Sequence, residues 1–167
     1  WKHRIDSSFI KRFSQSTAMT AQEPLDLPMR CGGCGAKVGN TILQRVMAEL
    51  QPVSHNNIII GLNSPDDAAV IQPPPGMVLV QTVDYFRSFI DDPYLIGRIA
   101  TNHCLSDIYA MGATPHSALA IATLPYQSEV LLEDSLRQLM QGALESLNLQ
   151  QTSLIGGHTS EGAEMGF

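Results

Sequence analysis

The stretch Asp92–Leu124, DPYLIGRIATNHCLSDIYAMGATPHSALAIATL, decides the fold class. Asp92 followed by Pro93 is typical of a helix N-terminus, because aspartate caps free N–H groups and proline fits the first helical position. Gly112 is expected to end this helix, and the apolar run Ser117–Leu124 then predicts a strand. A long helix is therefore followed directly by a strand.

The flanking segments extend this pattern. We expect a helix capped by Asn40 and running to about Leu50, and an amphipathic helix from Ser128 to about Leu147. Further strands are expected at Ile58–Ile60, Ala68–Ile71, Met77–Val83 and Ser153–Ile155, of which Met77–Val83 is the strongest. This order of elements is neither regular βαβ alternation nor all-β, so it predicts an α+β domain.

Composition restricts the function classes. The 167 residues are 44% hydrophobic and 16% charged, which is typical of a globular protein. A net charge of −6 argues against non-specific nucleic-acid binding. No apolar run is long enough for a transmembrane helix. Three cysteines without a secretory signal indicate a reducing environment, so we expect a cytoplasmic protein.

Residues 1–30 differ from the rest of the chain. Trp1, Ile5, Phe9 and Phe13 lie four apart among basic residues, which predicts a basic amphipathic helix. Such a helix docks on a membrane surface or a partner, or it is the tail of a preceding domain; we favour the tail. We therefore expect a tail over residues 1–15, a linker over 16–30 and one domain over 31–167.

A glycine-rich loop, Cys31-Gly32-Gly33-Cys34-Gly35-Ala36-Lys37, opens this domain. Its glycines allow backbone N–H groups to approach anionic oxygens, and Lys37 adds a positive charge. A thiol beside a cation favours its thiolate, so Cys34 is a candidate nucleophile. The alternatives are half of a zinc site or a redox pair with Cys31. The chain offers no second CxxC and no thioredoxin-like βαβ unit, which argues against both.

Four aspartates are candidate metal or phosphate ligands. Asp66 and Asp67 precede a predicted strand, Asp84 ends the strongest one, and Asp107 lies in an otherwise apolar helix. A buried charge is costly unless it is paired or metal-bound, and Mg²⁺ prefers carboxylate oxygens. Asp67 and Asp107 suit that task, whereas the structural alternative makes Asp66 a turn residue and Asp107 an exposed helix position. His103 lies one turn before Asp107 and is either a contact to a ligand or a packed histidine.

Gly156-Gly157-His158-Thr159 follows the last predicted strand. We expect a strand-to-loop turn here, whose exposed N–H groups and hydroxyl suit phosphate contact. Taken alone, the motif is not specific.

Together these segments resemble selenophosphate synthetase (selenide, water dikinase) over about residues 28–167. The matching pieces are CGGCGAK at Cys31–Lys37, DDAAV at Asp66–Val70, TVDYF at Thr82–Phe86, GRIATNHCLSDIYAMGATP at Gly97–Pro115 and GGHT at Gly156–Thr159. Related ATP-binding enzymes, including aminoimidazole ribonucleotide synthetase and thiamine monophosphate kinase, share most of these motifs. The cysteine–lysine loop selects the selenium enzyme, which makes selenophosphate, AMP and phosphate from selenide, ATP and water.

The resemblance implies site residues motif by motif. Cys34 and Lys37 match the catalytic cysteine and lysine, and Asp67 and Asp107 match magnesium ligands. The expected ATP contacts are Lys37, Ser64, Pro65, Asp66, Asp84, Asp107, Gly157, His158 and Thr159. One position departs from the family, which usually has asparagine where His103 stands here. Cys31 receives no chemical role.

The resemblance also implies an architecture. It predicts a mixed or antiparallel sheet with helices on one face, like the N-terminal domain of aminoimidazole ribonucleotide synthetase, and a homodimer that shares a β-barrel. The family's second, α/β half is absent from this sequence, so we expect no dikinase activity from the chain alone. Residues 1–13 resemble the end of a fused NADH-dehydrogenase-like flavoprotein. The rival interpretations are a sister ATP-dependent enzyme or a non-catalytic dimerisation or nucleotide-binding module.

Overall fold

The computed structural model describes residues 37–167, and the structural statements below concern these residues. They belong to one compact unit that extends from Cys31 to Phe167. The predicted N-terminal helix, the linker and most of the glycine-rich loop, with Cys31 and Cys34, lie outside the described residues.

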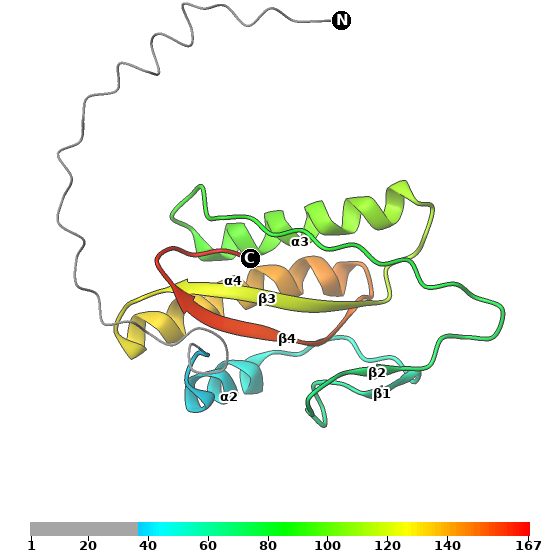
Figure 1. Cartoon of the computed structure of the whole chain (residues 1–167), viewed down its shortest axis with the longest axis horizontal. Helices are drawn as coiled ribbons and strands as arrows, with labels where there is room; N and C mark the ends of the chain where they lie inside the picture. Colours follow the sequence, from blue (N-terminus) through cyan, green and yellow to red (C-terminus); the bar gives the residue numbers. More distant parts are fainter. Residues whose placement is uncertain (1–36) are drawn as a thin grey trace, which may run out of the picture. The chain divides into compact units, whose positions relative to one another are not determined.

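Three helices and two small sheets make up the described part of the chain (Figure 1). β1 pairs with β2 antiparallel, and β3 pairs with β4 parallel. The elements are α2 (Asn40–Glu49), β1 (Ile58–Ile60), β2 (Val70–Ile71), α3 (Pro93–Ala110), β3 (Ser117–Pro125), α4 (Glu129–Leu149) and β4 (Ser153–Gly162). The predicted α+β composition is confirmed, but the described strands form two separate pairs where one mixed sheet was expected.

The predicted helix starts are correct to within a residue. Asp92 caps α3 by accepting a hydrogen bond from the Leu95 N–H at 3.0 Å, with Pro93 as the first helical residue. Asn40 was expected to cap α2, but it is the first helical residue and Gly39 occupies the cap position. Glycine tolerates that position without a side-chain bond.

The strand expected at Met77–Val83 does not form. Residues 77–83 pair with none of the described strands, and Val78 is 89% and Val83 74% exposed. From Gln81 to Ile90 exposed and half-buried residues nevertheless alternate, as in a half-buried strand. Backbone pairing begins only at Phe86, which exchanges two hydrogen bonds with Phe167 at 2.8 and 2.9 Å. This segment therefore has the side-chain alternation of a strand without the full hydrogen-bond ladder.

α4 is the central element, since it contacts α2, α3 and both strands of the β3–β4 pair. Its buried leucines join residues of α2 and β3 in one core. α3 and α4 approach closely through Gly97 and Gly142. A Cβ at Gly97 would lie 2.1 Å from the Leu139 carbonyl oxygen, and one at Gly142 would lie 2.0 Å from that of Tyr94. None of the helices within residues 37–167 is long and apolar enough to cross a membrane.

Candidate functional site

A line of polar contacts runs between the segment Thr82–Phe86 and one side of α3. The Thr82 hydroxyl donates to Asp107 Oδ2 at 2.8 Å. Two residues further on, Asp84 Oδ2 lies 3.8 Å from His103 Nε2. The ring of His103 meets that of Phe86 edge to face, with centroids 4.9 Å apart. These contacts bring Asp84 and Asp107, which the sequence singled out separately, to one side of α3.

The spacing of the two segments explains this alignment. Two residues of extended chain advance about 6.6 Å, and four residues of α-helix rise about 6 Å. When the segment runs antiparallel to the helix, Thr82 therefore lies beside Asp107, and Asp84 lies beside His103. The alternation that turns Val83 outward turns Thr82 and Asp84 toward α3.

Asp84 carries a buried oxygen without a hydrogen-bond partner among the described residues. Leaving a carboxylate oxygen desolvated and unpaired is unfavourable, and His103 at 3.8 Å lies beyond hydrogen-bond distance. Of the two interpretations of Asp107, a buried charge or an exposed helix position, the structure shows the exposed one. Hard oxygen donors of this kind suit Mg²⁺ or the donors of a bound ligand. The described residues fit a cation here, although they gather no set of three metal-binding side chains.

Cys104 lies beside this line but is not activated. Burial raises the pKa of its thiol, and the charges of Asp84 and Asp107 raise it further, while a hydrogen bond with the Asp84 backbone lowers it. The thiol is therefore protonated at neutral pH, unlike the thiolate that nucleophilic chemistry requires.

The loop between β1 and β2 carries four predicted site residues: Ser64, Pro65, Asp66 and Asp67. All four are exposed, and the Asp67 N–H donates to Asp66 Oδ1 at 2.8 Å. These two carboxylates do not join Asp84 and Asp107 in a cluster of three or more potential metal ligands. The structure thus assembles one part of the predicted site on α3 and leaves the other on a separate exposed loop.

Ser64 also lines a small pocket of about 80 Å³ with residues of β4, including Ser153, whose buried hydroxyl has no described partner. Pockets that enclose a drug-sized ligand measure about 300–1,000 Å³. This pocket is therefore too small for a nucleotide.

The GGHT motif lies inside a strand, so the predicted turn was wrong. Gly157, His158 and Thr159 belong to β4 and pair with residues 120–122 of β3. β4 continues to Gly162 because β3 supplies a full-length partner. A Cβ at Gly157 would lie 1.9 Å from the Ala120 carbonyl oxygen, so this close approach requires glycine. His158 is exposed on the strand, where it can still reach a ligand.

Lys37 is exposed and lies just before α2.

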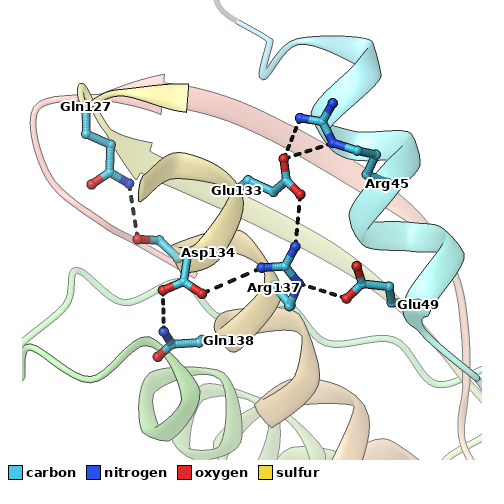
Figure 2. Close-up of polar contacts among 8 residues, drawn as sticks. Arg45, Glu49, Gln127, Glu133, Asp134, Arg137 and Gln138 are labelled. Atoms are coloured by element: carbon cyan, nitrogen blue, oxygen red, sulfur yellow. Dashed lines mark hydrogen bonds and ion pairs between the residues drawn. The ribbon is translucent and has the colours of Figure 1, made fainter. Parts of the chain in front are cut away.

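An ion-pair network, which the sequence reasoning missed, fastens α2 to α4 (Figure 2). Arg45 donates to Glu133, and Arg137 donates to Glu49 at 2.8 Å and to Glu133 at 2.9 Å. The hydrogen bond from Arg45 is the main cause that lowers the pKa of Glu133. The spacing of Glu133 and Arg137 is a recognisable helical signal, but their partners on α2 lie 88 residues away.

Comparison with known proteins adds two kinds of similarity. The family model described as AIR synthase related protein, N-terminal domain, matches residues 65–166. The selenide, water dikinase of Clostridioides difficile (strain 630) is 37% identical over 145 residues, which cover 86% of this chain and 40% of that protein. That of Agathobacter rectalis is 40% identical over 129 residues, covering 77% and 37%.

Among solved structures, the thiamine-monophosphate kinase from Stenotrophomonas maltophilia K279a is similar in fold. It aligns with a TM-score of 0.59 and 28% identity, over 75% of this chain and 39% of that one. The chain spans about two fifths of the length of these relatives. The resemblance seen in the sequence motifs is thus confirmed over most of the chain.

Proposed function

We propose, from the premise that the chain belongs to the AIR synthase related protein family, that it is the Mg-ATP-binding part of an enzyme that makes selenophosphate, AMP and phosphate from selenide, ATP and water. The observation that carries the proposal is the antiparallel alignment of Thr82–Phe86 with α3. It brings two carboxylates together within the region that the family model matches.

In this proposal Asp107 and Asp84 bind Mg-ATP at the side of α3. Thr82 fixes the orientation of the Asp107 carboxylate, which leaves its other oxygen for a cation. The unpaired oxygen of Asp84 accepts a hydrogen bond from the ligand. Magnesium held by Asp107, with Asp67 from the β1–β2 loop, would neutralise charge on the phosphates. The ATP is proposed to contact Ser64, Pro65 and Asp66 of the same subunit. By the family resemblance, Gly157, His158 and Thr159 would reach the ATP that is bound in the other subunit of the dimer.

The chemistry on selenium is assigned to the glycine-rich loop. Lys37 stabilises charge that moves between phosphate oxygens, and Cys34 positions the selenide that attacks the γ-phosphorus. This attack forms the Se–P bond of selenophosphate and breaks the bond to the β–γ bridging oxygen, which releases ADP. Water then hydrolyses ADP to AMP and phosphate. Because this reaction takes place in a reducing environment, we place the enzyme in the cytoplasm.

A homodimer is part of the proposal. The segment 77–83 and strand β3 expose Val78, Val83, Leu119 and Ile121. Large apolar side chains gathered on strand-like backbone mark an interface. A second copy supplies the apolar strands that these residues lack, as in the barrel that the family resemblance implies.

The test uses the longer protein that contains this chain, with selenide, ATP and Mg²⁺, and detects selenophosphate by ³¹P NMR. We expect selenide-dependent formation of selenophosphate and AMP, and its collapse in Cys34→Ser and Lys37→Ala. The similarity to thiamine-monophosphate kinase makes a sister kinase the second candidate. Phosphorylation of thiamine monophosphate, undiminished in Cys34→Ser, would establish that candidate and refute ours.

The chain by itself is proposed to lack this activity. The chain spans about 40% of the length of its relatives, and we propose that the reaction also needs groups from the remaining share of such a protein. Selenide-dependent release of AMP from ATP by the purified 167-residue chain would contradict this.

A further inference from the structure

Two imidazoles stack where the connection from α2 to β1 meets the turn before β3. The rings of His55 and His116 have centroids 4.8 Å apart and an interplanar angle of 24°. His55 Nε2 lies 2.7 Å from the carbonyl oxygen of Gln151, just before β4. His116 Nε2 lies 2.9 Å from Oδ1 of Asn57. The pair therefore joins three segments that are distant in sequence.

The hydrogen-bond partners fix the tautomer of each neutral ring. A carbonyl oxygen has no proton to give, so His55 Nε2 donates to Gln151. The Asn57 amide nitrogen donates to the Gln72 carbonyl at 3.3 Å, so the Asn57 oxygen faces His116 and accepts from its Nε2. In both rings Nδ1 keeps the lone pair. Uptake of a proton at Nδ1 therefore places a positive charge in the stack without breaking either hydrogen bond.

This stacked geometry does not suit a metal ion. A ligating imidazole directs its lone pair in the plane of the ring at a metal about 2 Å away. Two nearly parallel rings with centroids 4.8 Å apart do not direct their lone pairs at one point. Protonation is the chemistry that the pair supports.

The histidines belong to a polar seam that attaches the β1–β2 hairpin to the helices. The Val53 N–H donates to Asn148 Oδ1 at 3.1 Å, and the Asn148 amide donates to the Gln51 carbonyl at 3.1 Å. The Gln72 N–H donates to the Asn57 carbonyl at 2.9 Å, which continues the seam to β2. The strands β1 and β2 themselves pack chiefly against each other. The seam therefore supplies the polar part of the attachment of the hairpin, beside the apolar packing of Leu62 on the core.

We propose that the His55–His116 stack is a pH-sensitive latch on the β1–β2 hairpin. The neutral rings hold the hairpin to α4 and to the start of β3. A proton on His116 keeps both hydrogen bonds but loosens the hairpin, because the charge is partly desolvated and lies against the ring of His55. The loop at the hairpin tip carries Ser64, Pro65, Asp66 and Asp67, so the latch controls how firmly these residues are held. The latch does not depend on the proposed function, and its test needs no nucleotide.

The direction of the pH effect follows from the surroundings of His116. Burial of its ring lowers its pKa, and the neighbouring His55 lowers it further. His55 is the one titratable group of residues 37–167 whose charge acts on His116; Asn57, which faces the ring from the α2–β1 connection, is neutral. A base with a depressed pKa in the folded state stabilises the fold above its ordinary pKa of 6.5. This stability is lost as the pH falls through the depressed value, so the latch opens in acid.

Amide hydrogen exchange of the 167-residue chain at pH 7.5 and pH 5.5 tests the latch. After correction for intrinsic rates, protection of residues 58–72 relative to α4 is expected to fall about threefold to tenfold at pH 5.5. The variant His116→Phe keeps a ring in the stack but binds no proton, so the protection of residues 58–72 relative to α4 should be the same at both pH values. His158→Phe, at an exposed histidine of β4, should behave as wild type.

A wild-type ratio that does not change with pH overturns the latch, and so does an acid-induced loss in His116→Phe equal to that in wild type. If His116→Phe does not fold, the Cε1–H NMR resonance of His116 in the wild-type chain decides. A pKa below 6.5, with hairpin opening over the same pH range, supports the latch. A pKa of 6.5 or above contradicts it.

Discussion

At the scale of single residues, the site depends on two carboxylates that are held differently. Asp107 is exposed and is oriented by the Thr82 hydroxyl. Asp84 is half-buried and keeps one oxygen without a hydrogen bond. The first arrangement preorganises an oxygen donor, and the second leaves a desolvated charge that a bound cation or ligand donor would satisfy. Both features are understandable if Asp84 and Asp107 bind a ligand together.

Thr82→Val removes the hydroxyl that orients Asp107 and keeps the shape of the side chain. We expect the affinity of the chain for Mg-ATP to fall about two- to tenfold, because one hydrogen bond is lost, with little change in thermal stability. Isothermal titration calorimetry measures the affinity, and Thr82→Ser, which keeps the hydroxyl, is the control. Equal affinities of Thr82→Val and wild type would show that the hydroxyl has no part in binding.

Asp84 and Asp107 were predictable as candidates because they end or interrupt apolar runs, but the sequence left open whether Asp107 is buried or exposed. The apolar neighbours of Asp107 suggested burial. In α3, however, the buried residues Ile96, Ala100 and Leu105 lie on the side that faces α4, and Asp107 lies outside that stripe. Contacts such as His55–His116 escaped notice because the two residues are 61 positions apart and neither has a local signal.

At the scale of elements, helices were predictable and strand pairing was not. Helix ends depend on local capping, so Asp92-Pro93 located α3 correctly. A strand also needs a partner, which local sequence does not specify. Met77–Val83 has a stronger apolar pattern than Ser153–Gly162, yet only the latter finds a full partner, in β3. The GGHT motif was therefore misread as a turn.

Gly97→Ala tests the close packing of α3 on α4. The added methyl group would lie 2.1 Å from the Leu139 carbonyl oxygen, so the helices must separate. We expect the free energy of unfolding to fall by about 1–3 kcal/mol despite the better helix propensity of alanine. Chemical denaturation measures this, with Gln141→Ala at an exposed position of α4 as the control. An unchanged or higher stability of Gly97→Ala would refute the close approach.

Arg45→Gln tests the network that fastens α2 to α4. Arg45 is paired with Glu133 at the surface, so its loss should lower the Tm slightly at low salt. The difference should vanish in about 1 M NaCl, where charges are screened beyond about 3 Å. Arg87→Gln, which removes the more exposed pair with Glu164, is the control and should have a smaller effect. A loss of Tm that persists at high salt would mean that Arg45 acts through packing.

At the scale of the whole molecule, the exposed apolar side chains need a partner surface. Val78 and Val83 lie on a segment with strand-like alternation, and Leu119 and Ile121 lie on β3. The family was predictable from the sequence because each of its motifs consists of a few adjacent residues. The assembly was not, because it depends on surfaces contributed by distant segments.

Val83→Glu tests the proposed dimer. A charge at this 74% exposed position costs little in a monomer but is unfavourable in an apolar interface. By light scattering at micromolar concentration, we expect wild type to be dimeric and Val83→Glu monomeric. Gln81→Glu, at an exposed polar position of the same segment, should remain dimeric. A monomeric wild-type chain would contradict the proposal.

The central claim, that the segment 82–86 and α3 form the nucleotide site, is tested most directly by NMR of the isotope-labelled chain. On addition of Mg-ATP, we expect the largest amide shifts at residues 82–86 and 103–107, and their loss in Asp84→Asn. Shifts confined to other regions, or shifts at these residues that Asp84→Asn leaves unchanged, would contradict the account.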